Sequence, residues 1–243
     1  MVYAEWDVTS EESRRVALLG IAFHVLGDAL EEDESAEVCM GTSHGVSLCS
    51  PKVCPDTGWI ERLLTYTLGR AWLRLLPDGV ICGCAGECTG STEEIIRMLI
   101  RVYERGLEPH ISSKTLTGRE YFLVVGWNGE AVLAEGERRE VHVPGVPMAV
   151  FMHTHPGGVC LPSDRDLDSF AEFFSRGGLL TGIYSAQCRF MLWVRRPFAE
   201  ADYDLLAGLS RRVRGVKSYY EYMRLLEDSL EQAASLEYII ELI

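Results

Sequence analysis

The chain has 243 residues, of which 47% are hydrophobic, and this apolar content excludes an intrinsically disordered protein. A formal net charge of −13 argues against nucleic acid as the main partner, because an acidic surface repels phosphate backbones. The sequence shows neither an apolar run of about 20 residues nor the pattern of a signal peptide. We therefore expect no contact with a membrane and a cytoplasmic location.

Local signals in the first half of the chain predict helices that alternate with short extended segments. Apolar residues at helical spacing, preceded by capping residues, mark the helices. The expected helices are 10–31, 59–76 and 91–106, and the expected extended segments are 37–50 and 79–84. Thr9 or Ser10 caps the first of these helices, and Ser91 or Thr92 caps the third.

The second half of the chain predicts a β-hairpin, further strands and further helices. The hairpin joins strands 120–127 and 130–135 through Asn128-Gly129, where a type I′ turn requires a positive φ at Asn128. The remaining expected elements are a buried strand at 146–153, a helix at 163–176, two strands within 179–194, and helices at 200–214 and 217–242.

Helices and strands mixed in this order predict an α/β or α+β fold, in which helices flank a mixed sheet. The main domain is expected to span residues 91–198. It follows an N-terminal α/β region of unknown role at 1–90 and precedes C-terminal helices at 199–243. The basic run 211–217 lies in these helices, and we interpret it as a solvated helix face, with a local basic patch as the alternative.

Eight cysteines are many for a cytoplasmic chain, and their spacing leaves their role open. The chain has only one Asn and two Gln, and this depletion of thermolabile amides is typical of a hot-living source, in which intracellular disulfides occur. Structural thiols or disulfides are therefore one interpretation. A second metal site around Cys82, Cys84 and Cys88 is another, although these residues lack zinc-finger spacing.

Two histidines, His153 and His155, stand two residues apart at the end of a predicted strand. Residues at this spacing lie on one face of a strand, so both imidazoles can approach one ion. Ser163 is placed to cap the next helix, and Asp166 in its first turn can reach back toward the histidines. Two His and one carboxylate leave a fourth position for water, as in catalytic zinc sites. The alternative is a pair of loop histidines followed by an ordinary capping Ser-x-x-Asp.

The order His153-Thr154-His155, seven residues, Ser163-x-x-Asp166 resembles the motif of the JAMM/MPN+ zinc metalloprotease family. The resemblance covers about residues 92–198 and implies an MPN/cytidine-deaminase-like sheet. It also implies one Zn²⁺ per chain on His153, His155 and Asp166, with Ser163 stabilising the oxyanion. The family further requires an upstream glutamate as general base. Glu120 is the best candidate and Glu130, Glu135 and Glu140 are weaker ones; Leu123 stands where the common family pattern has its first Gly.

The resemblance implies a zinc isopeptidase or peptidase that removes a ubiquitin-like protein from its conjugates. A homo-oligomer or another MPN protein is a further possible partner. Other hypotheses are an ordinary peptidase, an enzyme that trims a sulfur-carrier precursor, a catalytically silent scaffold, and a RadC-like role near DNA, which the net charge disfavours. Inserts that position substrates in deubiquitinating relatives look short or absent, so recognition is expected to come from another part of the chain.

Overall fold

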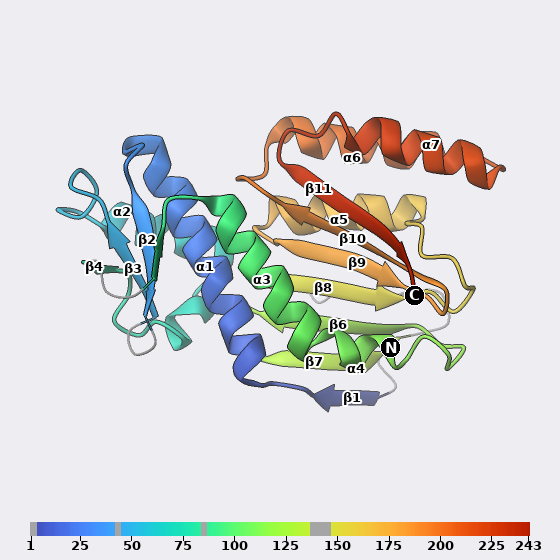
Figure 1. Cartoon of the computed structure of the whole chain (residues 1–243), viewed down its shortest axis with the longest axis horizontal. Helices are drawn as coiled ribbons and strands as arrows, with labels where there is room; N and C mark the ends of the chain where they lie inside the picture. The colour runs from blue at the N-terminus through green and yellow to red at the C-terminus, as the bar shows by residue number, and fades with distance from the viewer. Residues whose placement is uncertain (1–3, 42–44, 84–86, 137–146) are drawn as a thin grey trace.

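The computed structural model describes residues 4–41, 45–83, 87–136 and 147–243, and a seven-stranded mixed sheet forms its centre (Figure 1). The strand order is β1-β7-β6-β8-β9-β10-β11. Neighbouring strands run antiparallel except for β8 and β9, which are parallel. The strands are β1 (Ala4–Asp7), β6 (Tyr121–Gly126), β7 (Ala131–Glu135), β8 (Met148–Thr154), β9 (Leu180–Tyr184), β10 (Cys188–Val194) and β11 (Leu236–Leu242). The predicted mixed α/β class is confirmed.

Helices cover both faces of this sheet (Figure 1). The front face carries α1 (Glu11–Glu32), α3 (Thr92–Gly106) and the short α4 (Glu108–Ser112), while α5 (Asp164–Ser175) lies behind the sheet. Two further helices, α6 (Glu200–Val213) and α7 (Tyr219–Leu230), lie at the upper edge in this view, and α6 packs against α5. None of the helices in the described ranges combines the length and apolar character that crossing a membrane would demand.

The first 90 residues contribute to two sheets. Strand β1 pairs with β7 at the edge of the large sheet, and α1 packs along α3 on its front face. Residues between α1 and α3 build a smaller sheet in the order β4-β3-β2-β5, beside helix α2 (Gly58–Leu68) and a 3-10 helix (Ala71–Arg74). Its strands are β2 (Glu37–Gly41), β3 (Gly45–Cys49), β4 (Ile81–Cys82) and β5 (Glu87–Thr89).

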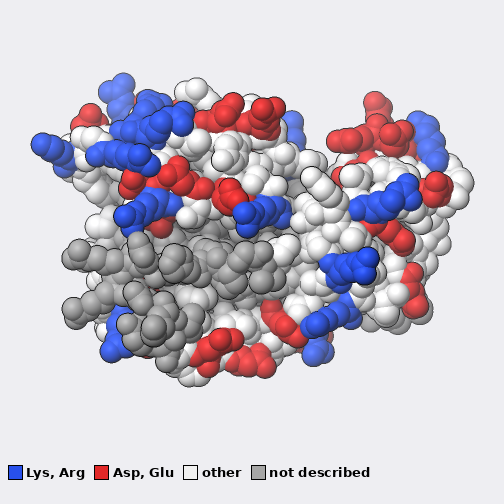
Figure 2. Space-filling model, turned by 180° about the vertical axis from the view of Figure 1, so that it is seen from behind, with Lys and Arg blue, Asp and Glu red and all other residues white. Residues whose placement is uncertain are grey.

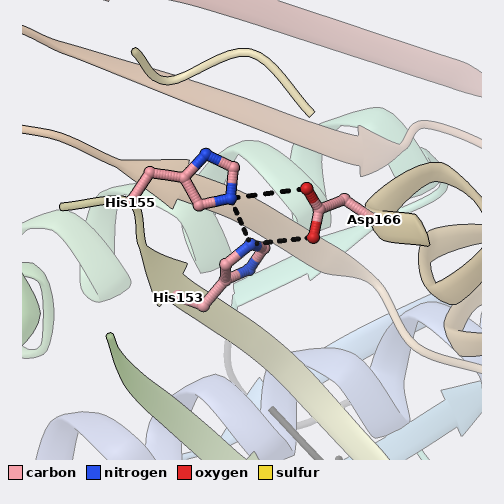
Figure 3. A group of neighbouring side chains, drawn as sticks. All are labelled: His153, His155 and Asp166. Atoms are coloured by element: carbon pink, nitrogen blue, oxygen red, sulfur yellow. Dashed lines mark hydrogen bonds and ion pairs between the residues drawn. The ribbon is translucent and has the colours of Figure 1, made fainter. Parts of the chain in front are cut away.

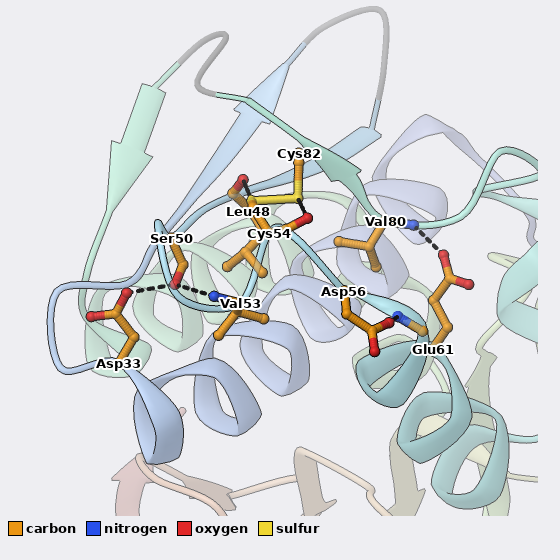
Figure 4. The surroundings of a disulfide bond; sticks show 10 residues. Asp33, Leu48, Ser50, Val53, Cys54, Asp56, Glu61, Val80 and Cys82 are labelled. Carbon is orange, nitrogen blue, oxygen red and sulfur yellow. Dashed lines mark hydrogen bonds between the residues drawn. A yellow bond between two sulfur atoms is a disulfide. The ribbon is translucent and has the colours of Figure 1, made fainter.

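Disulfide bonds hold this smaller sheet together. Cys39 in β2 is bonded to Cys88 in β5, and Cys54 is bonded to Cys82 in β4 (Figure 4). Cys49 is also disulfide-bonded. Because Cys82 and Cys88 have separate disulfide partners, the structure supports the disulfide interpretation over a metal site that they would share; Cys84 lies outside the described residues.

Two predicted helices are wrong in part, because each ends earlier than expected. The helix expected at 59–76 ends at Leu68, because Gly69 adopts a φ of +69° that leaves the helical conformation. The helix expected at 217–242 ends at Leu230, and Leu236–Leu242 instead forms β11, which pairs with β10 along its whole length. A strand here completes backbone hydrogen bonds that β10 would otherwise leave open at the sheet edge.

The predicted hairpin forms, but its turn differs from the predicted type. Asn128 does not have a positive φ, whereas Gly129 does, at +79°. The Gly129 amide donates to the carbonyl of Gly126, and the Gly126 amide donates to that of Glu130. This pattern is a type I turn followed by a glycine bulge, in which the glycine takes the left-handed conformation that we had expected of Asn128.

Candidate metal centre

The two histidines reach the same point because the β8–β9 ladder continues past the end of β8. His153 lies in β8, and the His155 amide donates to the carbonyl of Tyr184 at 2.8 Å, which keeps His155 in extended register. The rings therefore lie on one face of the sheet, with their centroids 5.0 Å apart. His153 is buried and packs against Phe151 and Phe170, which fixes its orientation.

Asp166 comes to the histidines from the first turn of α5. Ser163 is the N-cap of this helix: its Oγ accepts from the Asp166 amide at 3.2 Å, and its own amide donates to Asp166 Oδ2 at 2.6 Å. This capping box holds the carboxylate in place. The Ser163 hydroxyl acts as acceptor in the cap, so its proton is available to a further acceptor. Figure 3 shows Asp166 pointing at both imidazoles.

The side chains of His153, His155 and Asp166, which we call the triangle, bring their ligand atoms close together. His153 Nε2 lies 3.2 Å from His155 Nε2 and 3.1 Å from Asp166 Oδ1, and His155 Nε2 lies 3.4 Å from Asp166 Oδ2 (Figure 3). Tetrahedral zinc with bonds of about 2.0–2.1 Å separates its ligand atoms by about 3.3 Å. The two imidazole nitrogens have this spacing, and each lies close to a different oxygen of the Asp166 carboxylate, so His153, His155 and Asp166 could hold a metal ion.

The second ring nitrogen of His155 and the charge of Asp166 also suit a cation, whereas His153 Nδ1 is buried and has no hydrogen-bond partner among the described residues. His155 Nδ1 lies 3.2 Å from the carbonyl of Val159, to which a protonated Nδ1 donates. A ring held in this way presents Nε2 to a metal once Nε2 gives up its proton. Burial by itself raises the pKa of the Asp166 carboxyl, but hydrogen bonds from His153 and His155 outweigh it and hold that pKa well below its usual value. Asp166 is therefore an anion at any physiological pH.

Glu120 stands on the same face of the sheet, next to the triangle. Phe122 pairs with His153 across β6 and β8, and alternation along the strand places Glu120 on the face that His153 occupies. Burial raises the pKa of the Glu120 carboxyl, while the charges of His153 and His155 lower it and that of Asp166 raises it. The charges of these residues affect the Glu120 carboxyl because the predicted base lies beside the predicted metal ligands.

The weaker glutamate candidates have other partners. Glu130 is an exposed residue that pairs with Arg74. Glu135 is buried, forms an ion pair with Arg119 and accepts a hydrogen bond from the Tyr121 hydroxyl at 3.1 Å. Glu140 lies outside the described residues. The structure thus favours Glu120 over Glu130 and Glu135 as the carboxylate that accompanies the triangle.

Thr154, between the two histidines, holds the backbone on either side of Glu120, a role that our sequence analysis missed. Its side chain is fully buried. Its hydroxyl oxygen accepts from the Tyr121 amide at 2.9 Å, and the hydroxyl is placed to donate to the carbonyl of Arg119 at 3.4 Å. Since both partners adjoin Glu120, the residue between the metal ligands also positions the candidate base. No sequence pattern identifies the distant backbone partners of a hydroxyl.

The loop from His155 to Ser163 is held from two sides by contacts that the sequence did not predict. A disulfide joins Cys160 in this loop to Cys188 at the start of β10. Tyr222 of α7 donates a hydrogen bond from its hydroxyl to the carbonyl of Pro162. Burial raises the pKa of the Tyr222 hydroxyl, and the negative charge of Asp166 adds to this effect, so α7 reaches the edge of the site.

Comparison of the chain with protein-family models, curated proteins and solved structures finds no match. The resemblance to the JAMM/MPN+ family therefore rests on the motif alone. The structure adds that His153, His155 and Asp166 lie together, in a group that could hold a metal ion, and that Glu120 lies beside this group.

Proposed function

We propose that the protein is a zinc-dependent isopeptidase or peptidase of the JAMM type, which removes a ubiquitin-like protein from a target amine. The observation that carries this proposal is the group of His153, His155 and Asp166, on the sheet face that also carries Glu120. Its two imidazole nitrogens lie 3.2 Å apart, and they lie 3.1 Å and 3.4 Å from the two oxygens of Asp166. Three ligands of this kind leave one position open, as catalytic rather than structural zinc requires.

When bound, the ion would supply Lewis acidity and a water whose pKa is lowered to about 7. The protein's own groups account for the remaining steps. The Glu120 carboxylate accepts a proton from the attacking water and later delivers it to the departing amine. Burial raises the pKa of the Glu120 carboxyl above its usual value, a direction that favours a group that both takes and returns a proton. The Ser163 hydroxyl donates a hydrogen bond to the oxyanion that forms at the scissile carbonyl.

The first test measures zinc per chain by elemental analysis in the wild type, in His155→Ala and in His110→Ala. His110 is an exposed histidine on α4 and serves as the matched control. We expect about one zinc in the wild type and in His110→Ala, and a loss of zinc in His155→Ala. Protein that is purified without chelators and carries no zinc would contradict the proposal.

The second test measures hydrolysis of a ubiquitin-like domain fused through its carboxyl-terminal tail to a reporter. We expect cleavage by the wild type, and a loss of at least about a hundredfold in Glu120→Gln with zinc retained. Zinc binding without cleavage of any such fusion would favour the catalytically silent scaffold instead.

A further inference from the structure

The corner between α6 and α7, residues 211–220, is fastened to the candidate metal centre. Arg214 in this corner donates to Asp164 at 2.8 Å, and Asp164 begins the helical turn that carries Asp166. Just beyond the corner, Tyr222 donates to the carbonyl of Pro162, which precedes the helix cap. A macromolecule bound to the corner would therefore lie at a fixed position relative to the metal ligands.

The corner is basic although the chain as a whole is strongly acidic. Arg211, Arg212, Arg214 and Lys217 are all exposed. Figure 2 shows basic side chains gathered at this end of the molecule, at the upper left of the view. Arg214 pairs with Asp164 and Arg212 reaches Ser229, but across the described ranges Arg211 and Lys217 form no ion pair. Their charges are available to an acidic partner.

Two exposed tyrosines extend this surface. Tyr219 is 57% exposed and Tyr220 is 84% exposed, and their rings meet edge to face at 6.0 Å on the first turn of α7. Ser218 caps this helix and holds the turn in place. Tyrosine and arginine are the residues that most often supply binding energy at protein interfaces, because they combine large contact areas with hydrogen bonding.

We propose that the α6–α7 corner docks an acidic, folded protein, so that the tail of that protein reaches the metal centre. This inference rests on the proposed function and names its substrate class as a modifier with an acidic surface. Charge complementarity with Arg211 and Lys217 supplies the attraction, and Tyr219 and Tyr220 supply the contact area. A protein is favoured over nucleic acid because the net charge of −13 opposes a long polyanion that would extend beyond the corner.

The test compares two fluorogenic substrates that share one carboxyl-terminal tail: the bare tail peptide, and the tail attached to an acidic ubiquitin-like domain. The measured quantity is the kcat/KM for the tail attached to the domain, divided by the kcat/KM for the bare tail peptide. We expect this ratio to fall about tenfold in Arg211→Glu/Lys217→Glu and several-fold in Tyr220→Ser, and the docking effect to weaken as salt is raised. One matched control is Arg101→Glu/Arg105→Glu on α3, which lies on the sheet face opposite α5. The other is Tyr66→Ser on α2, where the tyrosine is 91% exposed.

A binding experiment keeps this inference separate from catalysis. Fluorescence anisotropy measures binding of the same acidic domain, and of a single-stranded oligo(dT), to Glu120→Gln protein with and without the corner substitutions. Domain binding that the corner substitutions weaken about tenfold, and the controls do not, supports docking even if no substrate is cleaved and the proposed function fails. Equal binding by corner and control variants would overturn the inference, as would no binding of the domain. Tighter binding of oligo(dT) than of the domain would show that the corner docks a nucleic acid instead, since bases can stack on exposed tyrosines and arginines.

Discussion

Replacing Thr154 by valine tests whether the residue between the two histidines positions the base. Valine keeps the shape of threonine but removes the oxygen that accepts from the Tyr121 amide at 2.9 Å. Since Thr154 is fully buried, the amide would lose its partner where water cannot replace it. A buried donor left without a partner costs about 1–3 kcal/mol. The contact with the Arg119 carbonyl is long, at 3.4 Å, and adds little. We therefore expect the free energy of unfolding to fall by about 2 kcal/mol.

The same substitution should reduce catalysis without removing the metal. Glu120 would lose the contacts on both sides of its backbone, and a misplaced catalytic group costs roughly 10- to 100-fold in rate. We expect Thr154→Val to lower kcat more than it raises KM, to shift the acidic limb of the pH–rate profile, and to retain zinc.

Thr154→Ser is the matched control, because it keeps the hydroxyl and loses only a buried methyl group, worth about 1 kcal/mol. Urea unfolding, elemental analysis and steady-state kinetics on both variants decide the matter. Equal kcat values for the valine and serine variants, or a valine variant as stable as the wild type, would refute the positioning role.

Three further predictions concern stability. Burial raises the pKa of Asp28 to about 6, so the folded state holds a proton that the unfolded chain releases, and stability falls as pH rises from about 4 to 6. Asp28→Asn should thus be about 1–2 kcal/mol more stable than the wild type at pH 7 and no more stable at pH 3, by thermal unfolding; an equal gain at both pH values would contradict this. Asp202→Ala removes a buried carboxylate that accepts from two backbone amides before β11, and should cost about 3 kcal/mol and speed hydrogen exchange in β11; unchanged exchange would disprove the anchoring role. Replacing Cys160 and Cys188 by alanine opens a disulfide across 28 residues and should lower the free energy of unfolding by roughly 3–4 kcal/mol in urea, whereas a loss below 1 kcal/mol would point to a reduced pair.

Local patterns in the sequence determined the elements that carry the site. A capping serine followed by apolar residues at helical spacing predicted the helix at 163–176, and the structure has α5 at Asp164–Ser175 with Ser163 as its cap. A continuous apolar run predicted the histidine strand, which is β8. The spacing of His153 and His155 also sufficed to place both imidazoles on one face, because alternation along a strand depends only on the local backbone.

Tertiary structure decided what local patterns cannot encode. Residues 236–242 carry apolar and acidic side chains that fit either a helix or a strand, and the open edge of β10 makes them a strand through Arg189–Glu241 and Trp193–Glu237 contacts. Three features of the site join distant segments of the chain. Glu120 lies beside the histidines, and Thr154 binds the backbone next to Glu120. The Cys160–Cys188 disulfide and the Tyr222 hydroxyl hold the loop between His155 and Ser163. Such contacts depend on strand order and register, which are properties of the whole sheet and of no single stretch of sequence.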